Sequence, residues 1–344
     1  MPLLNVPVLA RSDDRSQVVR EPAGIAQLVD AATRRAPVAG MVATSFDFFV
    51  DWECRQLEGY AWIKRTLPGG RALPTSRDEI EAAVAADPVI RRCCRLAHGQ
   101  GNGVTVAIFD DARDWSQSTG RDISMVNLPP DGPMRMTPVT LAQLRAAIQV
   151  KSGGPMRIGD KGLIYSTTAL EAHLSKTTAP WPGDADLVVF DADDHEPRCV
   201  IELKKHTERS RLPFHAQRVE NYAGPGGPDQ RKYDRLSLLA EQVSASGPLP
   251  LYTLYYSTVR GQDDLRLERV TRDGAGGFRG RPVATIGQST RLPTQVLETL
   301  YAATRRDALA HPPAAGVRSV VQQASPPPLA APAMRPIGRH VDQR

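Results

Sequence analysis

The feature that most constrains this chain is a pair of short apolar runs separated by a polar turn. Residues 187–190 form the first run and residues 199–203 the second, with turn-forming residues at 192–197 between them. Short β-branched runs bounded by turn formers indicate strands, and two such runs with a short gap indicate a hairpin. The sequence therefore predicts an antiparallel hairpin that turns near Asp194.

Charged side chains interrupt the apolar pattern at the open end of this hairpin. Glu202 and Lys204 are two positions apart, so they share one face of their strand. Asp186 falls opposite this segment and lies within cross-strand reach of it. Asp184 fits the same face by parity, but Asp186 is preferred because it directly precedes the apolar run. In the alternative interpretation, these charges form a solvated ion pair that protects a sheet edge.

The pattern of Asp186, a spacer and Glu202-Leu203-Lys204 resembles the PD-(D/E)xK nuclease superfamily, which has the restriction-endonuclease-like fold. The preceding segment, 182–186, is a looser version of the Pro-Asp pair that often opens the family's motif. The resemblance covers about residues 150 to 260. It implies an α/β fold in which a mixed sheet is flanked by helices.

The residue types fit the hydrolysis of a phosphodiester bond. This reaction uses a metal ion to hold the phosphate and to lower the pKa of the attacking water. Mg²⁺ prefers oxygen ligands and keeps several waters, so Asp186 and Glu202 suffice as its side-chain ligands. The resemblance implies the backbone carbonyl of Leu203 as a further ligand. Lys204 is expected to orient the water and to offset developing charge. The predicted catalytic residues are thus Asp186, Glu202 and Lys204, with Mn²⁺ as the alternative to Mg²⁺.

Other charged residues extend this predicted site. Residues 167–175 have a short helical pattern, and in the resembling family a helix at this place often supplies a further glutamate near the metal. Glu171 is therefore a candidate metal ligand, with a plain surface glutamate as the alternative. Basic residues follow the hairpin and continue into a predicted helix, where phosphate contacts are expected. The predicted nucleic-acid contacts are Lys205, Arg209, Arg231 and Lys232.

Aromatic residues over 45–67 have helical spacing, which predicts a long core helix. No internal repeat is visible in the sequence.

The segment Lys151-Ser-Gly-Gly-Pro155 is the predicted boundary between two domains. The tail is rich in Pro and Ala without periodicity, a composition that cannot build a core. The predicted parts are a flexible lead-in (1–24), an α-rich accessory or recognition domain (25–150), a nuclease domain (151–306) and a disordered Pro/Ala/Arg tail (307–344).

Composition narrows the functional classes. The formal net charge is +5, but residues 301–344 hold six arginines against two aspartates, so the rest is near neutral. Any basic surface that binds nucleic acid must therefore be local. The four cysteines have no metal-like spacing and fit a reducing cytoplasm. We expect no signal peptide, no membrane span and no membrane partner.

The sequence thus predicts a cytoplasmic, metal-dependent endonuclease. DNA is favoured over RNA by the resemblance alone, and so is a role in bacterial restriction or defence. The alternative is a nucleic-acid-binding or assembly module that keeps the nuclease fold without catalysis. A third interpretation is a protein–protein effector that acts through its tail. The sequence does not decide the oligomeric state. A homo-oligomer is one option, because nucleases that cut both strands often pair two sites.

Overall fold

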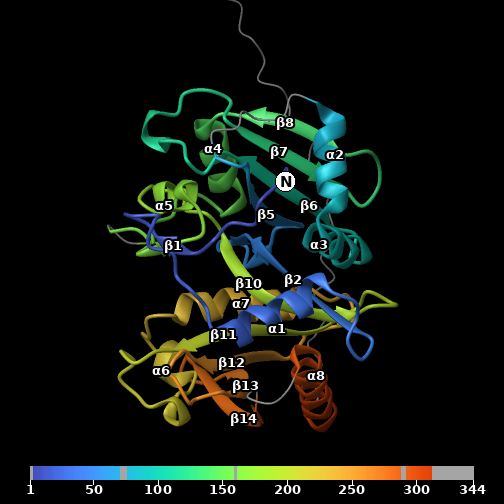
Figure 1. The fold of residues 1–344 in the computed structure, drawn as a ribbon, viewed down its shortest axis with the longest axis vertical. Coiled ribbons are helices and arrows are strands. Elements are labelled where there is room, and N and C mark those ends of the chain that lie inside the picture. The colour runs from blue at the N-terminus through green and yellow to red at the C-terminus, as the bar shows by residue number, and fades with distance from the viewer. Residues whose placement is uncertain (1–2, 70–75, 159–160, 288–291, 312–344) are drawn as a thin grey trace, which may run out of the picture.

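A ten-stranded mixed sheet organises the protein, with strand order β14-β13-β12-β11-β10-β2-β5-β6-β7-β8 (Figure 1). The computed structural model describes residues 3–69, 76–158, 161–287 and 292–311. Of the predicted disordered tail, residues 307–311 belong to the end of helix α8 and its cap, and the remainder lies outside the described residues.

The first half of the sheet contains β2 (Met41–Phe48), β5 (Tyr60–Thr66), β6 (Gly103–Phe109), β7 (Ile123–Leu128) and β8 (Arg135–Val139). The second half contains β10 (Gly183–Asp191), β11 (Pro197–His206), β12 (Leu251–Ser257), β13 (Asp264–Arg272) and β14 (Phe278–Gly287). Two short ladders pair β1 (Ala10–Arg11) with β9 (Tyr165–Ser166) and β3 (Val50–Asp51) with β4 (Gln56–Leu57). The helices are α1 (Ala23–Arg34), α2 (Arg77–Ala86), α3 (Pro88–Gly99), α4 (Leu141–Lys151), α5 (Ala169–Leu174), α6 (Glu220–Ala223), α7 (Gln230–Gln242) and α8 (Pro293–Ala310).

The two halves of the sheet repeat one order of elements. In the first, the β2–β5 hairpin is followed by α2 and α3, then by β6 parallel to β5, then by antiparallel β7 and β8. In the second, the β10–β11 hairpin is followed by α6 and α7, then by β12 parallel to β11, then by antiparallel β13 and β14. The halves meet where β2 pairs antiparallel with β10. The repeat is one of topology, which the sequence does not reveal.

Side-chain alternation divides the core between the two faces of the sheet. On β10, Val188 and Phe190 join an apolar cluster that contains residues of α2, α3 and α7. Leu187 and Val189, on the other face, join a cluster with residues of α1 and α8. A third cluster combines residues of α4 and α5 with the first-half strands. Helices therefore flank both faces, and the predicted mixed α/β class is confirmed at this level.

The predicted α-rich character of residues 25–150 is wrong, because this segment supplies five strands of the sheet. The predicted helix over 45–67 is replaced by strands β2 to β5. Its aromatic residues follow a period of two: Phe46 and Phe48 enter one apolar cluster, while Trp62 enters the cluster on the other face. Aromatic and β-branched residues also favour pleated, half-buried surfaces.

Helices α2 and α3 begin at side-chain caps. The Ser76 hydroxyl accepts a hydrogen bond from the Glu79 N–H at the start of α2. The Asp87 carboxylate accepts from the Val89 and Ile90 N–H groups at the start of α3. In the described part of the chain, no helix has both the length and the apolar character that crossing a bilayer requires.

Candidate active site

The predicted hairpin forms, and its charged end is where the strand ladder stops. Leu187 pairs with Ile201, so continuing the antiparallel register by one residue places Asp186 opposite Glu202. At this point the Leu203 N–H donates a hydrogen bond of 2.8 Å to Oδ2 of Asp186. The Asp186 carboxylate is therefore fixed between the two strands.

Glu202 forms the buried end of a carboxylate cluster with Asp184 and Asp186. Its side chain is 2% exposed, and its Oε1 lies 2.7 Å from Nζ of Lys232 on α7. The same ammonium lies 3.6 Å from Oδ1 of Asp184, whose side chain is 55% exposed. Among the described residues, no hydrogen-bond donor reaches the buried Oε2 of Glu202. The cluster thus runs from a buried, incompletely satisfied carboxylate to an exposed one.

The three carboxylates of this cluster carry more negative charge than the Lys232 ammonium can neutralise. Burial, followed by the neighbouring Asp186, raises the pKa of Glu202 well above its ordinary value. Burial also raises the pKa of Asp186, whereas the Lys232 ammonium lowers the pKa of Asp184. Burial disfavours the charged form of Lys232, but the carboxylates outweigh it and raise the pKa of this lysine. A proton or a further cation is therefore favoured between Asp186 and Glu202.

Lys204 has a different environment from the one that its motif position predicts. Its ammonium is bonded to Oδ2 of Asp229, the residue that precedes α7, and lies 4.1 Å from the ring centroid of Tyr222. Asp229 makes no side-chain cap to the helix, because its carboxylate faces this lysine instead. Lys204 therefore shares a strand face with Glu202 but is directed to the start of α7.

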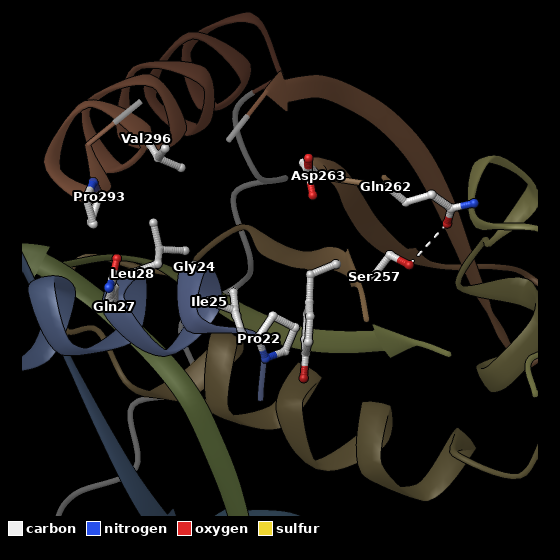
Figure 2. Close-up of a pocket in the computed structure, with 11 residues that line it drawn as sticks. Pro22, Gly24, Ile25, Gln27, Leu28, Ser257, Gln262, Asp263, Pro293 and Val296 are labelled. Atoms are coloured by element: carbon white, nitrogen blue, oxygen red, sulfur yellow. Dashed lines mark hydrogen bonds between the residues drawn. The ribbon is translucent and has the colours of Figure 1, made fainter. Parts of the chain in front are cut away.

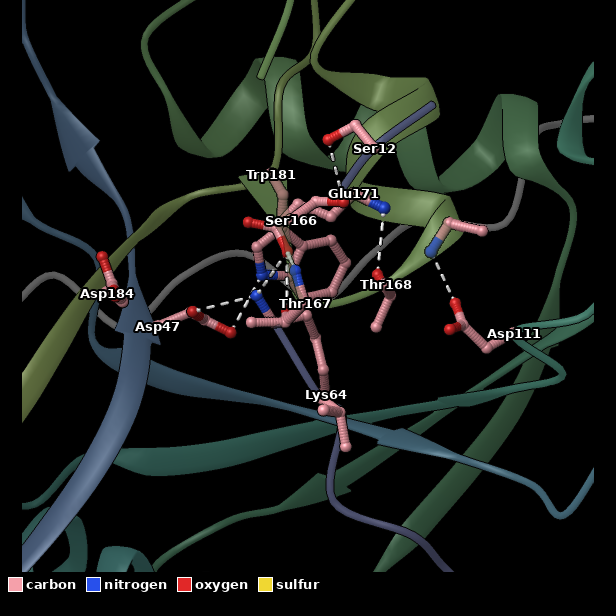
Figure 3. Close-up of polar contacts among 12 residues, drawn as sticks. Ser12, Asp47, Lys64, Asp111, Ser166, Thr167, Thr168, Glu171, Trp181 and Asp184 are labelled. Atoms are coloured by element: carbon pink, nitrogen blue, oxygen red, sulfur yellow. Dashed lines mark hydrogen bonds and ion pairs between the residues drawn. The ribbon is translucent and has the colours of Figure 1, made fainter. Parts of the chain in front are cut away.

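Glu171, on α5, lies in a second polar cluster with Asp47 of β2 and Lys64 of β5 (Figure 3). Its Oε2 lies 3.3 Å from Nζ of Lys64 and also accepts hydrogen bonds from Thr167. Lys64 in turn lies 3.4 Å from Asp47, which accepts a 2.9 Å hydrogen bond from the Trp181 indole. The described contacts of Glu171 are thus made here, and none of them is with Asp186 or Glu202.

The two polar clusters are neighbours, because Asp184 is the register partner of Asp47 in the β10–β2 ladder. Figure 3 shows Asp184 on the strand beside Asp47 and Lys64. Burial raises the pKa of Asp47 to about 7, although the Lys64 ammonium opposes this shift. Two lysines, Lys64 and Lys232, therefore act electrostatically on Asp184.

The predicted nucleic-acid contacts are dispersed. Lys205 forms an ion pair of 2.7 Å with Glu21, and Arg209 is exposed. Arg231 is exposed, with its guanidinium 5.6 Å from the ring centroid of Trp52. Lys232 is the member of this set that joins the carboxylate cluster. The sequence indicates only that basic residues continue into a helix, and it does not show that Lys232 meets the carboxylates.

A separate cavity of about 320 Å³ lies between α1, α8 and the end of β12 (Figure 2). Tyr256 and Ser257 line it, and the Ser257 hydroxyl donates a 3.1 Å hydrogen bond to Gln262. Asp263 is the charged residue of its described lining. Its described lining contains no lysine and no second carboxylate, so it differs from the site predicted around Asp186 and Glu202.

The carboxylate cluster fits a divalent cation by its chemistry. Asp186 and Glu202 supply hard oxygen donors, and the buried Oε2 of Glu202 has no donor among the described residues. Within those residues, no three Asp, Glu, His or Cys side chains are already arranged to hold an ion. Mg²⁺ needs only one or two carboxylates, because it keeps several of its waters.

Comparison with known proteins does not assign the chain to a family. No family model matches it, and no curated protein matches its sequence. Among solved structures, it is similar to one described as the crystal structure of the sex pheromone staph-cAM373 precursor. The identity is 10%, the match covers 80% of this chain and 85% of the other, and the TM-score is 0.18. A score this low carries no argument about fold or function.

Proposed function

We propose that this protein is a metal-dependent endonuclease that hydrolyses phosphodiester bonds, with DNA favoured over RNA. The observation that carries the proposal is the buried Glu202 carboxylate, which has an unsatisfied oxygen and faces Asp186 at the opened end of a hairpin. A buried carboxylate oxygen that lacks a hydrogen-bond donor is costly for stability, so its presence points to a ligand. A bacterial defence role and a cytoplasmic setting rest on the resemblance.

Asp186 and Glu202 would hold Mg²⁺ or Mn²⁺. The bound ion would supply a polarised phosphate and a water of lowered pKa. The chain's own residues position these ligands: the Leu203 N–H orients Asp186, and Lys232 orients Glu202. The exposed Asp184 lies at the accessible end of the cluster, where a phosphate backbone can approach.

The test is cleavage of supercoiled plasmid and of single-stranded oligonucleotides with Mg²⁺, Mn²⁺ or EDTA. We expect Glu202→Gln and Asp186→Asn to reduce the rate by about a hundredfold to a thousandfold, as when a transition-state contact is removed. Asp193→Asn is the matched control, because this exposed aspartate lies in the turn of the same hairpin. The described residues contain one such carboxylate cluster, so one protein molecule should cut one strand at a time. Nicked circular plasmid should therefore appear before linear plasmid.

The contrary outcome is cleavage by Glu202→Gln at the rate of the parent, which would remove the site assignment. A second candidate is a binding module without catalysis, favoured by the way in which Lys232 already neutralises part of the Glu202 charge. Retention of nucleic acid by the parent without cleavage under any metal condition would support that module instead.

A further inference from the structure

We propose that Lys232, on α7, is the catalytic lysine of this site, and that Lys204 is a structural residue that fastens the hairpin to α7. This inference rests on the proposed function. It assigns the lysine role to a residue outside the Glu-x-Lys motif.

The positions of the two ammonium groups support this exchange of roles. Lys232 contacts both Glu202 and Asp184, and its side chain is 35% exposed, so it reaches the cluster and the solvent together. Lys204 is 17% exposed and is engaged by the Asp229 carboxylate and the Tyr222 ring. For Lys204 to act at the cluster, these two interactions would first have to break.

The first half of the molecule provides an internal control. Arg65 on β5 corresponds to Lys204 on β11, because by strand alternation both lie on the sheet face whose residues Ile63 and Val200 are buried in the same apolar cluster. Arg65 Nε lies 2.7 Å from Oδ2 of Asp87, the residue that precedes α3. Asp229 precedes α7 and binds Lys204 in the same way. Both halves therefore contain an ion pair between the second hairpin strand and the aspartate that precedes the following helix.

The residues around that ion pair differ between the halves. Glu202 lies two residues before Lys204, and the corresponding position before Arg65 is Ile63. Lys232 lies three residues after Asp229, and the corresponding position after Asp87 is Ile90. Ile63 and Ile90 are both buried in an apolar cluster.

The first hairpin strand shows the same replacement. Asp47 pairs with Trp62, so the next step of the register places Phe46 opposite Ile63, as Asp186 stands opposite Glu202. Phe46 is also buried in the apolar cluster. The strand–helix ion pair of the first half therefore exists although apolar residues occupy the positions that correspond to Asp186 and Glu202. A lysine stands at this helix position only in the half that also carries Asp186 and Glu202, whereas the first half has Ile90 there. This association links Lys232 to the proposed hydrolysis.

The reaction gives Lys232 a defined task. A water oxygen forms a bond to phosphorus, the bond from phosphorus to the leaving sugar oxygen breaks, and no electron is gained or lost overall. The proton from the water passes to solvent, and the leaving oxygen takes up a proton. Negative charge rises on the phosphoryl oxygens, and the Lys232 ammonium, held beside Glu202, is placed to offset it.

The test compares Lys232→Met with Lys204→Met, which remove the same charge and keep a similar side-chain length. We expect Lys232→Met to reduce the cleavage rate by about a hundredfold or more. The same variant should bind Mn²⁺ several-fold more tightly in calorimetry, because a competing cation has left Glu202. Lys204→Met should keep cleavage within about tenfold of the parent and leave Mn²⁺ affinity close to the parent's. Its thermal midpoint should fall by several degrees, since Asp229 loses its partner.

Two further variants distinguish the loss of a functional group from a failure to fold. Lys232→Arg should retain part of the activity, and Lys204→Met combined with Asp229→Asn should recover part of the lost thermal midpoint. The inference is overturned if Lys204→Met abolishes cleavage while Lys232→Met cuts like the parent. It is also overturned if the two variants bind Mn²⁺ equally. If the parent protein neither cleaves nor binds Mn²⁺, both the proposed function and this inference fail. If the parent cleaves, the proposed function stands, and the two lysine variants then test the assignment of Lys232 separately.

Discussion

The two halves of the sheet follow one order of elements but fill equivalent positions differently. The first half buries Phe46, Ile63 and Ile90, whereas the second places Asp186, Glu202 and Lys232 at the corresponding positions. Apolar residues at such sites gain stability from burial, while charged ones lose hydration and repay it only in part. The first half shows that the architecture does not need the charges. Their presence in the second half is therefore evidence of a task other than folding.

Giving the second half the residues of the first should have the largest effect. We expect Glu202→Ile combined with Lys232→Ile to abolish cleavage while unfolding free energy stays level or rises by about 1–4 kcal/mol, as when a buried ion pair becomes apolar. Plasmid cleavage and urea denaturation measure both. Arg77→Ile combined with Glu81→Ile, an exposed pair on α2, is the control that should leave cleavage intact. Retained cleavage in the first variant would break the comparison.

The reverse exchange should damage stability. Ile63→Glu places a carboxylate in an apolar cluster that holds no lysine in the position of Lys232. We expect a loss of about 3–5 kcal/mol in unfolding free energy, the size of an uncompensated buried charge. Urea denaturation measures it, and Ile164→Glu is the matched control because Ile164 is 70% exposed. Equal effects at the two positions would contradict the burial argument.

A pH-dependent effect is expected at Asp47, the carboxylate opposite Asp184. Its pKa in the folded protein is about 7, raised mainly by burial, against about 3.9 in an unfolded chain. A raised folded pKa means that the native state binds the proton more tightly. Its contribution to stability is therefore present below about pH 4 and is lost as the pH rises to about 7. The thermal midpoint should fall over this range, and Asp47→Asn should flatten that fall, whereas Asp193→Asn should not. If the thermal midpoint of Asp47→Asn changes with pH as steeply as that of the parent, another group is responsible for the pH dependence.

The hairpin and its acidic residues could be predicted because their evidence is local. Alternation along 187–190 and 199–203 fixes which side chains share a face, and the structure brings Asp186 next to Glu202 accordingly. The spacing of the large residues over 45–67 predicts a helix, but the segment forms strands. That spacing is compatible with either period, and pairing with the neighbouring strands decides between them.

The sequence by itself determined the hairpin and the residues that carry charge at its open end. Tertiary structure alone decided which lysine meets the carboxylates and which cluster receives Glu171. The first depends on how α7 packs against the sheet, and the second on the packing of α5 against first-half strands. Sequence periodicity reports which face of an element is apolar, but the partner that a charged side chain meets depends on elements distant in the chain.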